Sequence, residues 1–207
     1  MASSEIRRRT LWIGLAALWL CGTGAGLAAL AVYANRPGAP AHAPARWPAA
    51  SRMALDGTRP TLVMLAHPKC DCTRASVAEL AELMARAPHR ARAYVVFMKP
   101  TGVEDDWEHT DLWNAAARIP DVSVLIDDEG REAARFGAET SGQALLYDAG
   151  GRLVFAGGTT VARGHDGDNA GFASILALVT GEPAAQATSP VFGCPLFNEP
   201  PGSPRED

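Results

Sequence analysis

The sequence predicts an α/β domain with a central mixed sheet flanked by helices, preceded by an N-terminal transmembrane helix. Two observations lead to this fold class. Short apolar runs alternate with amphipathic segments through the middle of the chain, as strands and helices do when a sheet is covered on both faces. A long apolar stretch without charges stands near the N-terminus, well before the first of these runs.

The N-terminal apolar stretch runs from Leu11 to Tyr33. At a rise of about 1.5 Å per residue, it is long enough to cross a hydrocarbon core of about 30 Å. Arg7, Arg8 and Arg9 precede it, and such charges are retained in the cytoplasm. We therefore expect residues 1–10 in the cytoplasm, a single span of the inner membrane by residues 11–33, and the rest of the chain in the periplasm. A cleaved export signal is the alternative, with Ala29-Leu30-Ala31 as its small-residue cleavage site.

The composition narrows the classes of protein. With 47% hydrophobic residues, the 207-residue chain is too apolar to be disordered throughout, and four cysteines are too few for a disulfide-stapled mini-protein. Residues 1–50 carry a net charge of +4, whereas the remaining residues carry 14 basic and 22 acidic side chains, a net of −8. An acidic body without a basic patch gives no reason to expect nucleic-acid binding.

The chain divides further by composition. Residues 34–59 are rich in Pro and Ala without a period, which predicts a semi-extended linker to the folded domain. Residues 60–182 hold the alternating elements, and residues 183–207 form a Pro-rich tail that we expect to be irregular. The expected strands are Thr61–His67, Ala93–Met98, Val122–Ile126, Ala144–Tyr147 and Leu153–Ala156.

Four helices are expected among these strands. The first has apolar residues at helical spacing and ends before Pro88, and the second has its acidic residues in its first turn, where the helix dipole favours them. The last two strands flank Asp148-Ala149-Gly150-Gly151, a hairpin signal. The expected helices are Thr73–Arg86, Glu104–Ile119, Arg131–Phe136 and Asn169–Val179.

Two cysteines, Cys70 and Cys72, lie between the first strand and its helix. Thiols at a helix N-terminus face unpaired backbone N–H groups and the positive end of the dipole, which lowers their pKa and favours the nucleophilic thiolate. The neighbouring Lys69 is expected to add to this effect, and His67 to donate a proton or to bind a metal. Two structural cysteines without reactivity are the alternative.

This order of elements and the cysteine motif resemble the thioredoxin-like superfamily, in particular its membrane-anchored bacterial members that face the periplasm. The resemblance covers residues 55–182, and residues 136–148 resemble the family's approach to the strand that faces its active site. Two departures stand out. The family's motif is Cys-x-x-Cys, whereas this chain has Cys-x-Cys, and Gly142 takes the place of the family's cis-proline.

The short motif has a redox consequence. A ring closed by Cys70 and Cys72 is tight, and the helix N-terminus stabilises the reduced thiolate, so their disulfide should be readily reduced. We expect a potential above about −270 mV, nearer about −180 mV. A third thiol, Cys194, lies in an apolar island of the tail that predicts docking onto the domain, where it would compete for one of the pair.

The predicted function is a thiol–disulfide oxidoreductase that needs no bound cofactor. Cys70 is the expected attacking thiol and Cys72 the resolving one, although the roles could be reversed. The partner would be a protein thiol or disulfide, or a small thiol. A copper-binding module that holds Cu(I) through Cys70 and Cys72, with His67 or Cys194 as a further ligand, is one alternative, and a redox-inert scaffold is another.

Overall fold

The computed structural model describes residues 2–197, with side chains from Glu5 onward. The chain forms two compact units, which divide between Arg36 and Pro37. The last residues of the predicted tail, 198–207, lie outside the described part.

The first unit is one long helix, α1 (Ala2–Ala34). Within Glu5–Ala34, an 18-residue window has a mean hydropathy of 1.9, and large apolar side chains such as Trp12 and Trp19 are more than 60% exposed. The hydroxyls of Thr10 and Thr23 each donate to the carbonyl four residues before, so they need no water as a partner. Among the described residues, this helix is long and apolar enough to cross a membrane, a property it shares with signal sequences.

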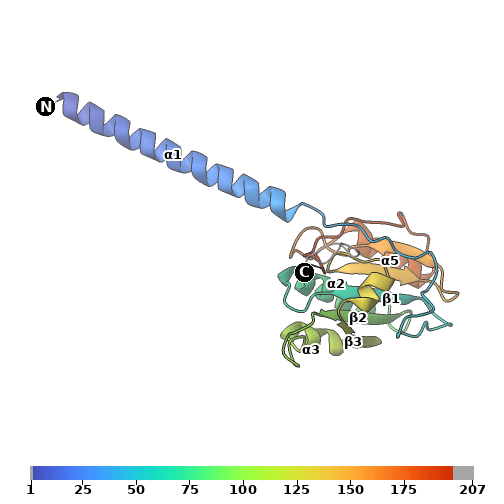
Figure 1. The fold of residues 1–207 in the computed structure, drawn as a ribbon. Helices are drawn as coiled ribbons and strands as arrows, with labels where there is room; N and C mark the ends of the chain where they lie inside the picture. Colours follow the sequence, from blue (N-terminus) through green and yellow to red (C-terminus); the bar gives the residue numbers. More distant parts are fainter. Residues whose placement is uncertain (1, 198–207) are drawn as a thin grey trace. The chain divides into compact units, whose positions relative to one another are not determined.

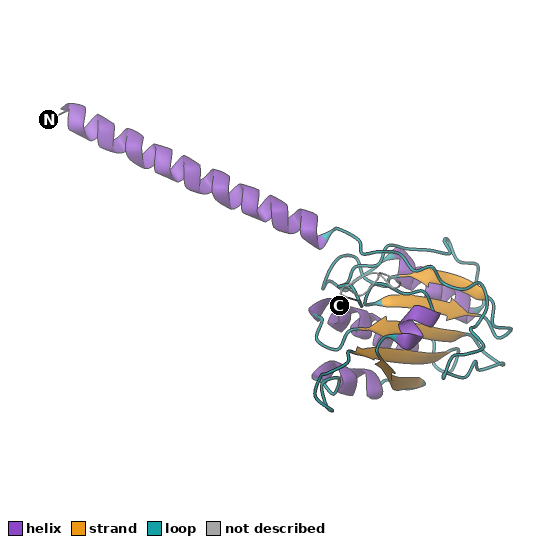
Figure 2. Ribbon diagram, viewed as in Figure 1, coloured by secondary structure: helices purple, strands orange, loops and turns teal. Residues whose placement is uncertain are grey.

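The second unit is built on a five-stranded mixed sheet in the order β3-β2-β1-β4-β5 (Figures 1 and 2). β1 pairs in parallel with β2, β2 pairs in parallel with β3, and β4 runs antiparallel to both β1 and β5. This is the parallel sheet with a terminal hairpin that the sequence predicts. The strands are β1 (Thr61–Ala66), β2 (Arg92–Lys99), β3 (Val122–Asp128), β4 (Gln143–Tyr147) and β5 (Leu153–Gly157).

Four helices cover the two faces of the sheet (Figure 2). Three of them pack on one face: α2 (Asp71–Arg86), α3 (Asp111–Ala117) and α5 (Ala170–Thr180). The short α4 (Arg131–Arg135) lies on the other face. Each face of the sheet has its own hydrophobic core, and β1 contributes side chains to both cores. Leu62 and Met64 point toward α2 and α5, while Val63 and Leu65 point into the core on the opposite face. Burial on both faces explains why β1 is an uninterrupted apolar run.

One predicted helix is wrong in extent. The sequence pattern predicts a helix over Glu104–Ile119, but the structure has helix only over Asp111–Ala117, with turns before it. The Lys99 ammonium lies 2.9 Å from a carboxylate oxygen of the buried Glu108 and 2.7 Å from the carbonyl oxygen of Asp105. This contact with the end of β2 holds the acidic segment in turns.

The predicted linker also differs from the structure. From Pro37 onward, the segment expected to be semi-extended packs against the domain instead. The ring of Trp47 lies edge-on to Phe136 and Tyr147, with both centroid distances 5.3 Å, and Met53 is 4% exposed. These two apolar anchors outweigh the extended tendency of the surrounding Pro and Ala residues.

Candidate functional site

The cysteine pair lies where β1 gives way to α2. Cys70 is the N-cap of α2 with an extended backbone, and its carbonyl accepts from the N–H of Thr73 at 2.9 Å. Its side chain is almost completely buried, at 4% exposure, whereas Cys72 in the first helical turn is half-buried. The pair thus stands at the carboxyl end of a central strand, the edge of an α/β sheet where reactive groups gather.

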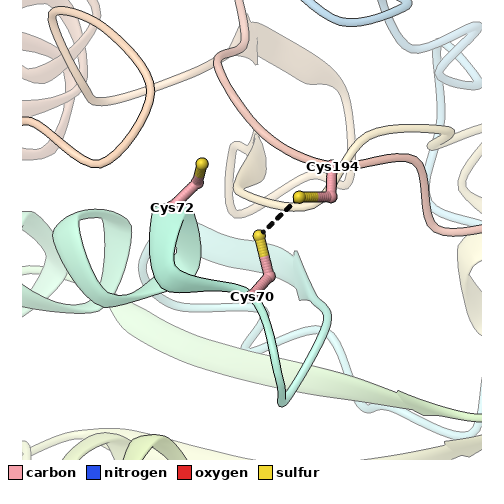
Figure 3. Close-up of side chains that lie close together, drawn as sticks. All are labelled: Cys70, Cys72 and Cys194. Carbon is pink, nitrogen blue, oxygen red and sulfur yellow. Dashed lines mark hydrogen bonds between the residues drawn. The ribbon is translucent and has the colours of Figure 1, made fainter. Parts of the chain in front are cut away.

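The tail brings a third thiol to this pair. The Sγ atoms of Cys70 and Cys194 lie 3.1 Å apart and are hydrogen-bonded, and Figure 3 shows them facing each other, with Cys72 on the adjoining helical turn. The three Sγ atoms all lie within 4.8 Å of one another, and all are free thiols. The structure therefore forms a cluster of Cys70, Cys72 and Cys194, which we call the three-thiol cluster.

Cys70 is the thiol most easily ionised in this cluster. Burial raises the pKa of the Cys70 thiol, but hydrogen bonds from the Cys194 side chain and from the backbone N–H groups of Cys194 and Thr73 outweigh it and hold the pKa below its usual value. The lowered pKa favours Cys70, among the two cysteines of the motif, as the thiolate.

The other two thiols have the opposite tendency. Burial and the neighbouring Cys70 raise the pKa of Cys72, and the same two causes raise the pKa of Cys194 to about 12. As the pH rises, Cys70 is therefore the first thiol of the cluster to lose its proton, ahead of Cys72 and Cys194.

The cation that faces these thiols is Arg163, a residue that the sequence did not single out. It follows β5, is half-buried, and its guanidinium donates to the carbonyl oxygen of Gly193 beside Cys194. Its charge opposes the rise in the pKa of both Cys72 and Cys194. No local motif marks Arg163, because more than 90 residues separate it from Cys70 in the sequence.

The predicted supporting residues His67 and Lys69 have other contacts. The backbone N–H of His67 donates to Ser141 Oγ at 2.8 Å, and its Nδ1 accepts from the Lys69 N–H at 3.2 Å. Burial and the Lys69 charge lower the pKa of His67. The Lys69 ammonium lies over the ring of Trp107, 4.8 Å from its centroid. Among the described residues, His67 does not belong to the group of ligand atoms within 4.8 Å.

Gly142 lies immediately before β4, opposite the start of α2. Its φ of +86° favours glycine, and its N–H donates to the Leu65 carbonyl at 2.8 Å. A Cβ atom here would lie 2.6 Å from Ser76 Oγ on α2. The preceding Ser141 is fully buried and its hydroxyl is 2.7 Å from that of Thr73, so this segment is fastened to the helix that carries the cysteines. The described residues include no cis peptide bond.

Comparison with known proteins bears on the fold alone. No protein-family model matches the sequence, and no curated protein matches it. A hypothetical protein from Sinorhizobium meliloti matches over 78% of this chain and 93% of its own, with 18% identity and a TM-score of 0.57. An uncharacterized conserved protein from Geobacillus kaustophilus matches over 81% and 93%, with 16% identity and a TM-score of 0.57. The pneumococcal exposed lipoprotein thioredoxin from Streptococcus pneumoniae matches over 59% and 84%, with 18% identity and a TM-score of 0.42.

The strand order β3-β2-β1-β4-β5 and the cysteines at the start of the helix that follows β1 decide the fold class. The chain has a thioredoxin-like fold. This agrees with the resemblance drawn from the sequence. In the thioredoxin-like domain, the segment 139–142, which precedes β4, is hydrogen-bonded through its backbone to the tail around Cys194 and lies next to the cysteine motif.

Proposed function

We propose that the protein is a thiol–disulfide oxidoreductase with Cys70 as its nucleophile. One observation carries the proposal: an easily ionised thiol at the N-terminus of α2 is hydrogen-bonded to a second thiol at 3.1 Å. A thiolate and an adjacent thiol are the two groups that disulfide exchange requires.

The reaction follows from these groups. The Cys70 thiolate attacks one sulfur of a partner disulfide, forms a mixed disulfide and releases the partner's other sulfur as a thiolate. A second cysteine of the cluster, Cys72 or Cys194, then attacks the Cys70 sulfur, loses its proton and releases the first partner sulfur. Two electrons pass to the partner, and the cluster ends as a disulfide. The reverse sequence oxidises a dithiol partner. The partner is a protein or a small thiol.

The proposal includes a location. The length and composition of α1 suit a membrane anchor, and the three arginines before its apolar stretch favour a cytoplasmic N-terminus. The thioredoxin-like domain would then lie on the periplasmic side of the inner membrane, where disulfides persist.

A second candidate function is soft-metal binding. Three thiols within 4.8 Å of one another match the thiolate ligands that Cu(I) prefers. Burial and thiol neighbours keep two of the three protonated, so a metal would have to displace their protons on binding.

Turnover and metal content of the full chain, purified in detergent without oxygen, separate these functions. We expect the reduced protein to catalyse the reduction of insulin disulfides by dithiothreitol, and Cys70→Ser to abolish this. Cys21→Ser is the matched control, because Cys21 lies in α1 and its loss should change nothing. Stoichiometric copper without turnover would replace the proposal by the binding function, and neither property would indicate a redox-inert scaffold.

A further inference from the structure

The tail is fastened along the domain by a series of backbone contacts. The Ala187 carbonyl accepts from Ala156 in β5, and the Val191 carbonyl accepts from Gly38, at 2.9 and 2.8 Å. Val191 and Leu196 are only 3% and 2% exposed. The tail therefore follows a defined course to Cys194, although its described residues form only isolated bridges, at Thr188 and Pro195, and no helix or continuous strand.

At Cys194, the tail pairs with the segment that precedes β4. Ser141 N–H donates to the Cys194 carbonyl and Leu196 N–H donates to the Glu139 carbonyl, both at 2.8 Å, which forms an antiparallel bridge between Thr140 and Pro195. This pairing fixes the backbone on both sides of Cys194. It aims the Cys194 side chain at Cys70.

Cys72, the second cysteine of the Cys-x-Cys motif, lies differently relative to Cys70 than Cys194 does. Cys70 is the N-cap of α2, and Cys72 is the second residue inside the helix. The Cys72 Sγ lies within 4.8 Å of the Cys70 Sγ, whereas the Cys194 Sγ lies only 3.1 Å from it. The hydrogen bond between the Cys70 and Cys194 sulfurs therefore joins the start of α2 to the tail (Figure 3).

We propose that Cys194 is the resolving thiol of this site, so that the oxidised protein carries a Cys70–Cys194 disulfide and Cys72 stays a free thiol. The inference rests on the proposed function and makes Cys194 a catalytic residue. The two sulfurs lie 3.1 Å apart, so they need to approach by only about 1 Å to reach bonding distance.

Resolution by Cys194 exchanges one sulfur–sulfur bond for another and moves one proton. Cys194 attacks the Cys70 sulfur of the mixed disulfide, the Cys70–Cys194 bond forms, and the bond to the partner breaks. The partner sulfur leaves as a thiolate and takes up the proton that Cys194 loses. Burial raises the pKa of Cys194, and so does the neighbouring Cys70 thiolate. The second cause disappears once Cys70 is part of a disulfide, and the nearby Arg163 guanidinium favours the Cys194 thiolate.

Peptide mapping of the full chain tests the inference directly. The protein in detergent is oxidised with excess oxidised glutathione, quenched in acid, alkylated and cut with trypsin. Cleavage after Lys69 and Arg74 places both motif cysteines in peptide 70–74, while Cys194 lies in peptide 164–205. We expect the two peptides to be joined, with one alkylated thiol in peptide 70–74. Cys72→Ser should keep this link, and Cys70→Ser should lose it.

A variant of the tail keeps all the thiols but disturbs the docking. A Cβ atom at Gly193 would collide with the Ser141 carbonyl oxygen, and Gly193 does not need the left-handed backbone. Gly193→Ala should therefore lower the linked fraction about tenfold or more, because Cys194 loses its high effective concentration at Cys70. Gly150→Ala is the matched control, since its Cβ would make an ordinary contact at 3.4 Å with Asp148 in the hairpin.

The outcomes separate this inference from the proposed function. An internal disulfide in peptide 70–74, with peptide 164–205 alkylated and insulin turnover unchanged in Cys194→Ser, would overturn the role of Cys194 and leave the oxidoreductase intact. A chain that forms neither disulfide, or turnover that survives Cys70→Ser, would overturn both.

Discussion

The hydrogen bond from the Cys194 thiol to Cys70 should set the pH at which Cys70 reacts. Replacing Cys194 by Ala removes the side-chain donor but keeps the backbone N–H that also supports the thiolate. The charged form of Cys70 then loses one of its hydrogen bonds, and the pKa of Cys70 should rise.

The expected size follows from general values. A hydrogen bond to a charged group contributes about 1.5–3 kcal/mol, and a sulfur donor is weak, which favours the lower end of that range. Since one pKa unit corresponds to about 1.36 kcal/mol, the pKa of Cys70 should rise by about one unit. Wherever the pKa lies above the working pH, the thiolate fraction should fall about tenfold.

The assay is the pH dependence of Cys70 alkylation by iodoacetamide, followed by mass spectrometry. It is run on a Cys72→Ser background, because both motif cysteines lie in one tryptic peptide. The titration midpoint is compared rather than the absolute rate, because loss of the Cys194 side chain also exposes Cys70. Cys194→Ser restores a hydroxyl donor and should recover part of the shift. A midpoint in Cys194→Ala that stays in place or moves to lower pH would refute the reasoning.

Three further predictions concern other parts of the chain. Arg163→Met should raise the pH midpoint of Cys72 alkylation, because it removes the neighbouring cation. Arg152→Met in the exposed hairpin is the control and should leave that midpoint unchanged. Equal midpoints in Arg163→Met and in the unchanged protein would contradict this role of Arg163. Thr73→Val should lower the free energy of unfolding in urea by about 1–3 kcal/mol, since the buried Ser141 hydroxyl then keeps only the His67 N–H as a partner, while Thr73→Ser should preserve stability. A reporter that is active only outside the cytoplasm, fused after Asp207, should be active, and a silent fusion would exclude the proposed topology.

Local patterns were enough to predict most of the fold. Strands buried on both faces are continuous apolar runs, and β1 shows this over its whole length. The predicted helix over Glu104–Ile119 failed because an ion pair between Lys99, at the end of β2, and Glu108 decides the conformation of that segment. The packing of the predicted linker depends on Trp47, whose partners Phe136 and Tyr147 are about 90–100 residues away. Such contacts leave no periodic signal.

The site was predictable to a similar degree. Cys70 and Cys72 are neighbours in the sequence, so their place at a helix N-terminus follows from the boundary between strand and helix. The apolar residues around Cys194 gave the prediction that the tail docks. The hydrogen bonds of Ser141 and the position of Arg163 depend on pairing between distant segments, which no motif encodes.

The structure also changes the physical basis for expecting an oxidising disulfide. Strain in a tight ring between Cys70 and Cys72 is one of the two causes from which the sequence predicts an easily reduced disulfide. A bond between Cys70 and Cys194 spans 124 residues and has no such ring, so that source of strain is absent. What remains is stabilisation of the reduced form through the Cys70 thiolate. Each pKa unit by which Cys70 is lowered stabilises that form by about 1.36 kcal/mol, equivalent to about 30 mV for a two-electron couple. The hydrogen bonds around Cys70, rather than the Cys-x-Cys spacing, should therefore set how oxidising the site is.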